Sequence, residues 1–147
     1  MCRQAQYVVV MGVSGSGKTE VARRVAQATN SRWLDADDYH PFENIKHMRN
    51  GQPLNDDMRW PWLSAVSDAA LKHASDMPDG NTSKMMFIAC SALKRRYRDF
   101  LCRTLNPVIF VFLDGTRDVI QARLEHRTGH FMPSTLLDSQ LADLEPP

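Results

Sequence analysis

Short apolar runs alternate with longer amphipathic stretches along this chain. Runs at residues 7–11, 32–35, 85–90 and 108–113 have the length and composition of buried strands. Each run is followed by a stretch that reads as a helix or as a turn leading into one. Such alternation favours a parallel sheet flanked by helices, so we predict an α/β fold with four strands.

The helices are expected between these strands. They are predicted over residues 19–28, 57–73, 94–103, 117–127 and 134–144, with a short one at about 43–49. Pro61 falls in or close to the first turn of the second helix, where proline is tolerated. The polar segment 75–83 reads as an exposed loop, and residues 128–133 interrupt the last helical region.

Length and composition indicate one globular domain over residues 1–147. The chain has 43% hydrophobic and 24% charged residues, a balance typical of folded domains. A net charge of +1 gives no general attraction to nucleic acid or to acidic membranes, so neither is an expected partner. The longest apolar run, residues 107–113, is far shorter than the roughly 20 residues that cross a bilayer.

The cysteines indicate a reducing compartment. Cys2, Cys90 and Cys102 are odd in number, widely spaced and lack a CxxC pair. This pattern disfavours both a disulfide framework and a structural zinc site. The N-terminus also lacks the pattern of a signal peptide, and we therefore expect a cytoplasmic protein with free thiols.

The strongest local signal is GVSGSGKT at residues 12–19, between a predicted strand and a predicted helix. It matches the P-loop pattern GxxxxGK[ST], in which glycines let successive backbone N–H groups converge on phosphate oxygens. Lys18 supplies a positive charge for the β- and γ-phosphates, and the Thr19 hydroxyl can ligate magnesium. The predicted nucleotide-binding residues are Gly12, Val13, Ser14, Gly15, Ser16, Gly17, Lys18 and Thr19.

Two carboxylates follow the second strand. Asp35 and Asp37 are two residues apart and can aim at one site where the strand unwinds. One can then serve the magnesium shell while the other accepts a substrate proton. A solvated acidic turn or a helix cap explains the same residues equally well. The neighbouring Asp38 is expected at the surface.

Cationic residues precede a glycine-containing segment near the end of the chain. Arg123 and Arg127 are four residues apart, so they share one helix face that can stabilise a transferring phosphoryl group or simply be solvated. His130 fits either a contact with the substrates or an exposed position. Asp114 fits either a Walker B carboxylate, which directly follows a strand, or the first residue of an Asp-Gly turn. Trp60 and Trp62 are expected to pack in the core or in the wall of a cleft.

Six strings in order along the chain carry a resemblance to a known family. They are MGVSGSGKT, LDADDYHP, NIKHM, G-x-PLNDDMRWPWL, CSALKRRYRD and RTGHFMP, and together they cover nearly the whole chain. The sequence resembles the gluconate kinases (gluconokinases), small P-loop kinases similar in fold to shikimate and adenylate kinases. The second, fourth and fifth strings are much more specific to this family than the P-loop.

The resemblance implies ATP- and Mg²⁺-dependent phosphorylation of D-gluconate to 6-phospho-D-gluconate, which feeds the pentose phosphate pathway. It implies that Asp37 deprotonates the substrate hydroxyl and that Asp35, rather than Asp114, lies near the metal. It also implies a substrate-binding insertion at about 40–75, a lid at about 123–133 that carries Arg123 and Arg127, and a possible homodimer. The implied gluconate contacts are Asp37, His40, Arg59, Ser91, Lys94, Arg98 and His130.

The sequence departs from the family pattern at its end. In the family, a fifth strand and a final helix follow the LEPP segment, and the loop after that strand packs on adenine. This sequence ends at Pro147. We therefore expect the phosphate site and most of the sugar-acid site, with adenine binding and one sheet edge incomplete. The alternatives are a non-catalytic truncated isoform and a related kinase for another small molecule.

Overall fold

Four parallel strands form the central sheet, in the order β2-β3-β1-β4. The structure is a computed structural model that describes residues 5–77, 84–126 and 134–147. The strands are β1 (Gln6–Met11), β2 (Arg32–Asp35), β3 (Met85–Ala89) and β4 (Val108–Phe112). The α/β prediction and its four strands are confirmed, with strand ends that differ by at most one residue.

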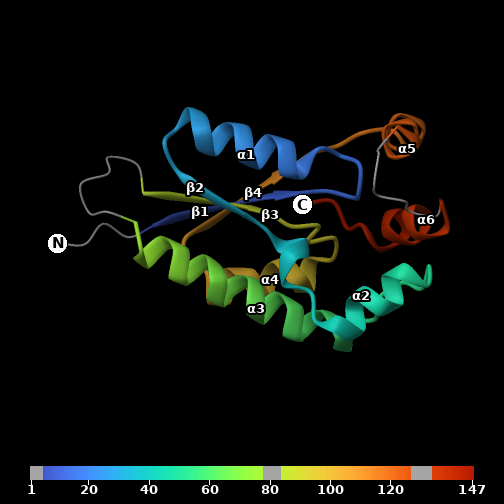
Figure 1. Ribbon diagram of the computed structural model, residues 1–147, viewed down its shortest axis with the longest axis horizontal. Helices are drawn as coiled ribbons and strands as arrows, with labels where there is room; N and C mark the ends of the chain where they lie inside the picture. Colours follow the sequence, from blue (N-terminus) through green and yellow to red (C-terminus); the bar gives the residue numbers. More distant parts are fainter. Residues whose placement is uncertain (1–4, 78–83, 127–133) are drawn as a thin grey trace.

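Helices cover the sheet on both sides (Figure 1). They are α1 (Lys18–Ala28), α2 (Phe42–Arg49), α3 (Asp56–Ser75), α4 (Arg95–Thr104), α5 (Arg117–Glu125) and α6 (Ser134–Asp143). A 3-10 helix that the sequence did not predict, η1 (Ala36–Tyr39), follows β2 directly. The predicted loop was residues 75–83, of which residue 75 still belongs to α3 and residues 78–83 lie outside the described residues. The predicted interruption at 128–133 also lies outside them.

The alternation of side chains along β1 builds two cores. Val9 and Met11 point to the layer of α3 and α4, whereas Val8 and Val10 pack against Ala22 and its neighbours on α1. Because helices cover both faces, the strand is apolar at nearly every position. Burying a valine of this kind contributes about 1.5–3 kcal/mol, so β1 anchors the loop that follows it.

One edge of the sheet exposes apolar side chains. Ile109 and Val111 of β4 are 53% and 41% exposed, and they pair in register with Val8 and Val10. They therefore share the face that α1 covers elsewhere, over β1, β2 and β3. Within the part of the chain that the structure describes, this edge is therefore an uncovered apolar surface.

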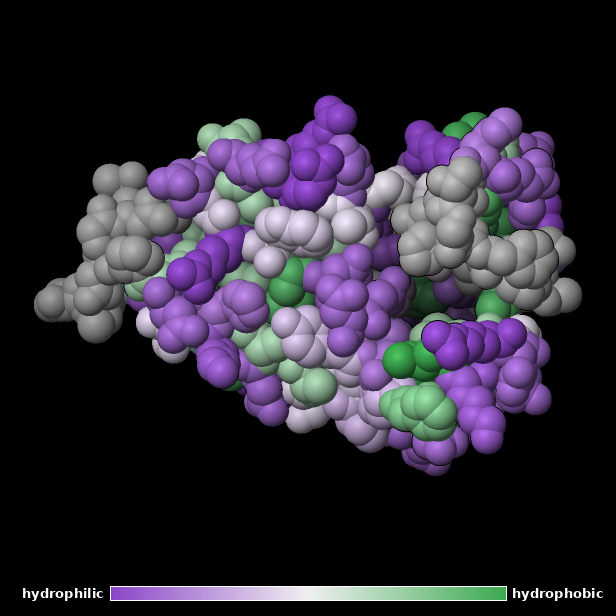
Figure 2. Space-filling model, viewed as in Figure 1, coloured by the Kyte–Doolittle hydropathy of each residue, from purple (hydrophilic) through white to green (hydrophobic). Residues whose placement is uncertain are grey.

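The rest of the visible surface is mainly polar. Figure 2 shows hydrophilic side chains over most of one face, with smaller hydrophobic areas between them. None of the described helices is long and apolar enough to cross a membrane.

The parallel strands bring their carboxyl ends to one edge. The loop after β1 contains the P-loop, β2 runs into η1, and β3 leads into residues 90–94. The Gly12 N–H donates to the Ser91 carbonyl at 3.3 Å, so the first and third of these connections touch. Ligand sites of open α/β sheets lie at this edge.

Candidate active site

The P-loop is curled by glycines whose backbone conformation other residues rarely adopt. Gly17 has φ 97° and ends the loop as the residue before α1. Gly15 has φ 85°, and a Cβ there would lie 2.9 Å from Cγ of Leu124 on α5. Left-handed backbone and close approach both require glycine. The loop therefore depends on its glycines for its shape and for contact with α5.

The P-loop fits a phosphate group. Ser16 Oγ is buried and has no hydrogen-bond partner among the described residues. The Lys18 ammonium donates to the Val13 carbonyl at 3.1 Å, so it lies folded over the loop. The N-terminus of α1 adds backbone N–H groups and the positive end of the helix dipole. An unsatisfied hydroxyl, a nearby ammonium and a helix N-terminus together form an anion site.

Thr19 and Asp35 form the predicted metal-side pair. The Thr19 hydroxyl donates to Asp35 Oδ2 at 2.8 Å, and the other carboxylate oxygen accepts from the Asp37 N–H at 2.9 Å. Asp35 thus caps η1, which was one of the two alternatives left open by the sequence, and still presents oxygen ligands of the kind that Mg²⁺ prefers. The described residues hold no group of three His, Cys, Asp or Glu side chains that could by itself bind a metal ion, so phosphate and water would complete such a shell.

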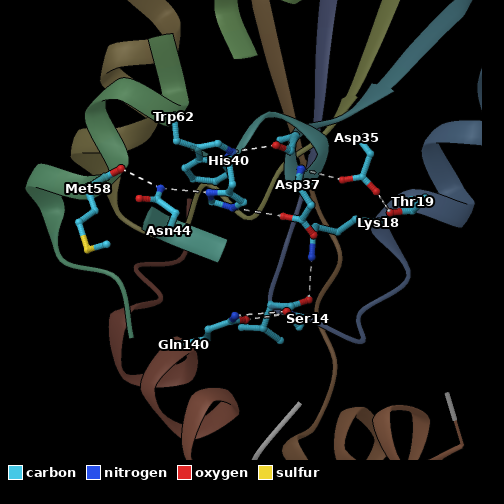
Figure 3. Close-up of polar contacts among 12 residues, drawn as sticks. Ser14, Lys18, Thr19, Asp35, Asp37, His40, Asn44, Met58, Trp62 and Gln140 are labelled. Carbon is cyan, nitrogen blue, oxygen red and sulfur yellow. Dashed lines mark hydrogen bonds and ion pairs between the residues drawn. The ribbon is translucent and has the colours of Figure 1, made fainter. Parts of the chain in front are cut away.

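Asp37 extends into the same space as Lys18 and Asp35 (Figure 3). Its side chain is 74% exposed, and its Oδ1 lies 3.7 Å from His40 Nε2. Asp38 is exposed, as predicted. Partial desolvation, and then the negative charges of Asp35 and Asp37, raise the pKa of Asp38. The acidic group at the start of η1 therefore lies beside the cationic P-loop.

The ring of His40 packs against Trp62 of α3. The two rings stack with centroids 4.3 Å apart and planes 13° from parallel. Trp62 is 2% exposed and donates its indole N–H to the Ala36 carbonyl at 2.7 Å. The packing role predicted for Trp62 is confirmed. The structure places His40, predicted as a gluconate contact, next to Asp37.

Arg98 supports the backbone of the site. Its guanidinium donates to the carbonyls of Ala92, Leu93 and Glu145 at 2.7, 3.1 and 2.6 Å. Arg98 is only 6% exposed, and burial lowers the pKa of its guanidinium. These three contacts support the loop after β3, and the role of Arg98 as a gluconate contact remains a prediction from the family resemblance.

The other two predicted cations lie in a polar cluster with Tyr97. The Arg59 guanidinium donates to the Tyr97 hydroxyl at 2.6 Å and lies 3.5 Å from Asp143. The Lys94 ammonium lies 3.3 Å from Asp56 and 3.9 Å from Asp143. The structure thus brings Arg59 and Lys94 together beside the carboxylates of Asp56 and Asp143, and Arg96 also pairs with Asp56 at 2.8 Å.

Hydrogen bonding within this cluster changes two pKa values. The Tyr97 hydroxyl donates to Asp56, and this bond, followed by that from Lys94, lowers the pKa of Asp56. Burial, and then the bond to Asp56, raises the pKa of Tyr97 to about 12. A cavity of about 600 Å³ opens beside the cluster. Its lining residues are Pro53, Leu54, Asn55, Asp56, Asp57, Lys94, Ser139 and Asp143.

One of the two predicted arginines reaches the P-loop. Arg123 of α5 lies with its Nη1 3.4 Å from the Ser16 carbonyl. Arg127 and His130 lie outside the described residues. Asp114 is exposed, in the irregular segment between β4 and α5.

Sequence reasoning missed several residues of the site. Asn44, Asp56 and Asp143 contact predicted site residues, and Gln140 contacts the P-loop. Asn44 and Asp56 stand within strings that carried the family resemblance, which was the available signal. Gln140 and Asp143 had no local signal, because they reach the site only through the packing of α6.

The fold and the glycine-rich loop define a P-loop nucleotide-binding protein of the α/β class. A family model described as an AAA domain matches residues 8–147. The thermoresistant gluconokinase of Escherichia coli is 47% identical over 140 residues, which cover 95% of this chain and 76% of that protein. A crystal structure of a gluconokinase from Sinorhizobium meliloti aligns with a TM-score of 0.81 at 46% identity, covering 99% of this chain and 78% of that one. The chain belongs to the gluconokinase family.

A more distant similarity bears on the fold alone. Shikimate kinase from Bacteroides thetaiotaomicron aligns with a TM-score of 0.62 at 16% identity, covering 93% of this chain and 76% of that one. The predicted relation in fold to shikimate kinase is confirmed.

Proposed function

We propose that this protein transfers the γ-phosphoryl group of ATP to the 6-hydroxyl of D-gluconate, giving 6-phospho-D-gluconate and ADP. The observation that carries the proposal is the convergence of Lys18, the Thr19–Asp35 pair and Asp37 at one edge of the sheet. It occurs in a chain that is 47% identical to a protein named gluconokinase. A phosphate cradle beside a carboxylate is the arrangement that phosphoryl transfer to a hydroxyl needs.

In the proposed mechanism, Asp37 accepts the proton of the attacking hydroxyl. Its carboxylate is exposed to solvent, from which a substrate arrives, and its backbone N–H is held by the Asp35 cap. Lys18 and Arg123 supply positive charge around the P-loop as negative charge develops on the transferring group. A bound Mg²⁺, held by Thr19 and Asp35, would further neutralise the phosphate oxygens.

We assign recognition of the sugar acid to the connection after β3 and to the polar cluster beside it. Ser91 lies next to the P-loop through the Gly12 contact, and Lys94 lines the cavity. A polyhydroxy acid needs a cation for its carboxylate and a mixture of polar groups for its hydroxyls. Lys94 and Arg59 supply the cations, and the carboxylates of Asp56 and Asp143 can accept from hydroxyl groups. Arg127 and His130 remain predictions from the family resemblance.

The cytoplasm is the compartment that we propose. Among the described residues, Cys90 is buried and Cys102 is exposed, and both are free thiols. Free thiols of this kind persist under reducing conditions.

Homodimerisation remains a prediction from the family resemblance.

A coupled assay of ADP formation tests the proposal. We expect ADP to form only when gluconate, ATP and Mg²⁺ are all present, and ³¹P NMR to identify the product as the 6-phosphate. Lys18→Met and Asp37→Asn should each lower kcat by at least about 100-fold, the lower range for a positioned acid–base group. Shikimate and nucleoside monophosphates serve as alternative acceptors.

Two outcomes would reject the proposal. Faster phosphorylation of shikimate or of a nucleotide would assign a different small-molecule kinase. A thermal shift with Mg-ATP but no ADP formation with any acceptor would favour the non-catalytic alternative.

A further inference from the structure

Asn44 is a buried amide beside the site to which the proposed chemistry gives no role. It lies in the first turn of α2 and is 2% exposed. Its Nδ2 donates to the Met58 carbonyl at 2.9 Å and lies 3.2 Å from Nδ1 of His40 (Figure 3). A carbonyl oxygen only accepts hydrogen bonds, so the contact with Met58 fixes which end of the amide is the nitrogen.

The amide in turn fixes the protonation of His40. The Asn44 nitrogen carries two hydrogens, and one of them serves Met58. The other meets His40 Nδ1, which must therefore accept. A neutral imidazole carries one proton, so that proton resides on Nε2. His40 is the Nε2–H tautomer by hydrogen-bond accounting alone.

The position of the ring determines where the Nε2–H group points. The His40 side chain is 4% exposed and stacks on Trp62, so its ring cannot turn freely. Its Nε2 lies 3.7 Å from Oδ1 of Asp37. That distance exceeds an ordinary hydrogen bond, but contacts of this kind commonly tighten when substrate binds. The opposite tautomer would aim a lone pair at the carboxylate and repel it.

We propose that Asn44 is a positioning residue that acts through His40 on Asp37. By holding His40 as the Nε2–H tautomer, it directs an N–H toward the Asp37 carboxylate and orients that carboxylate to accept the proton of the acceptor hydroxyl. Asp35 and Trp62 fix the backbone of η1. These two contacts hold backbone groups, whereas His40 Nε2 faces the side chain of Asp37. The inference rests on the proposed role of Asp37 as proton acceptor.

The tautomer can be measured without any turnover. ¹⁵N NMR of histidine-labelled wild-type protein at pH about 8, where an ordinary histidine is neutral, reports which ring nitrogen carries the proton. The His40 resonances are assigned by their loss in His40→Gln. We expect a protonated Nε2 and an unprotonated Nδ1. A protonated Nδ1 in the wild type would overturn the inference.

Asn44→Asp changes the same hydrogen bond with minimal change of shape. A carboxylate cannot donate, so the single imidazole proton of His40 should move from Nε2 to Nδ1, and kcat should fall by about 10- to 100-fold, as for other groups that orient a reactive side chain. The KM for ATP should change less than about twofold, since the P-loop is untouched. Asn50→Asp, an exposed change at the C-terminal end of α2, is the matched control. Unchanged kcat in folded Asn44→Asp would overturn the inference.

A second pair of variants keeps the test decisive if Asn44→Asp does not fold. The amide nitrogen of a glutamine at position 40 overlays Nε2 of histidine, whereas that of an asparagine overlays Nδ1. Both variants lose the stack on Trp62 equally. We expect His40→Gln to retain at least about tenfold more kcat than His40→Asn, and equal loss in both would overturn the inference. A protein with the Nε2–H tautomer but no gluconokinase activity would instead reject the proposed function.

Discussion

Gln140 of α6 holds Ser14 of the P-loop by two hydrogen bonds. The Ser14 N–H donates to Gln140 Oε1 at 2.8 Å, and Gln140 Nε2 donates to Ser14 Oγ at 3.2 Å (Figure 3). The two residues are 126 positions apart in the chain. Leu137, one turn earlier on α6, packs in a buried cluster with Val13. The last described helix is therefore fastened to the nucleotide cradle by polar and apolar contacts.

Replacing Gln140 should loosen the P-loop. Gln140→Ala removes two partly buried hydrogen bonds worth about 0.5–1.5 kcal/mol each, so the free energy of unfolding should fall by about 1–3 kcal/mol. Because the lost bonds hold the phosphate loop, the KM for ATP should rise more than the KM for gluconate. Urea denaturation and steady-state kinetics measure the two effects.

Gln27→Ala is the matched control, since Gln27 is exposed on α1. It should change neither quantity beyond about 0.5 kcal/mol or twofold. A Gln140→Ala protein with wild-type KM for ATP would show that α6 does not position the loop.

The features fixed by local pattern could be predicted. The apolar runs placed all four strands, and the GxxxxGK[ST] string placed the P-loop between β1 and α1. The place of Asp35 near the metal, and so beside Thr19, was implied by the family resemblance, because the local sequence fitted a solvated turn or a helix cap equally well. The strands and the P-loop needed only neighbouring residues.

The partners of long side chains could not be predicted in the same way. Arg98 sits in a family-specific string, but its orientation toward three carbonyls depends on how α4 packs behind the loop after β3. Gln140 lies on a helix of mixed polarity, and its contact with Ser14 exists only once α6 is docked. Tertiary packing decides such contacts, and local sequence does not encode it.

Asp35→Asn should raise the Mg²⁺ requirement. The change removes a negative charge beside Thr19 but leaves an oxygen that can still accept from the Asp37 N–H. Asparagine caps helices about as well as aspartate, so the fold should be retained. We expect the Mg²⁺ concentration for half-maximal activity to rise by at least about tenfold, the usual scale for altered metal shells.

The neighbouring carboxylate provides the comparison for this test. Asp38→Asn makes the same charge change at an exposed position of η1 and should leave the Mg²⁺ dependence within about twofold of the wild type. Equal Mg²⁺ dependence in wild type and Asp35→Asn would remove Asp35 from the metal site.

Arg98→Met should destabilise the protein. Methionine has a similar length but leaves three backbone carbonyls without their donor. An unsatisfied buried acceptor costs about 1–3 kcal/mol, and relaxation of the loop will recover part of the total, so we expect a loss of about 2–4 kcal/mol in urea denaturation. Arg95→Met, exposed on the same helix, should change stability by less than about 0.5 kcal/mol. A loss confined to the KM for gluconate, at wild-type stability, would instead show that Arg98 contacts the substrate and does not support the loop.

Tyr97 should make the protein sensitive to alkaline pH. Burial and the bond to Asp56 raise its pKa from 10.0 to about 12 in the folded state. Above pH 10.0 the unfolded chain loses this proton while the fold keeps it, so stability should decrease as pH rises towards about 12. The contribution of one such group is at most about 1.4 kcal/mol per pH unit.

Tyr97→Phe removes this contribution. The variant should be less stable than the wild type near neutral pH, because Arg59 and Asp56 lose their shared partner. The difference in unfolding free energy should shrink as pH rises above 10.0. In this range the wild type loses stability because its unfolded chain releases the Tyr97 proton, and the variant has no such proton. Urea denaturation across this range measures the difference, with Tyr39→Phe as a control outside the cluster. The absorbance of tyrosinate gives the pKa directly, and a wild-type-minus-variant titration centred at 10.0 would contradict the proposed hydrogen bonding of Tyr97.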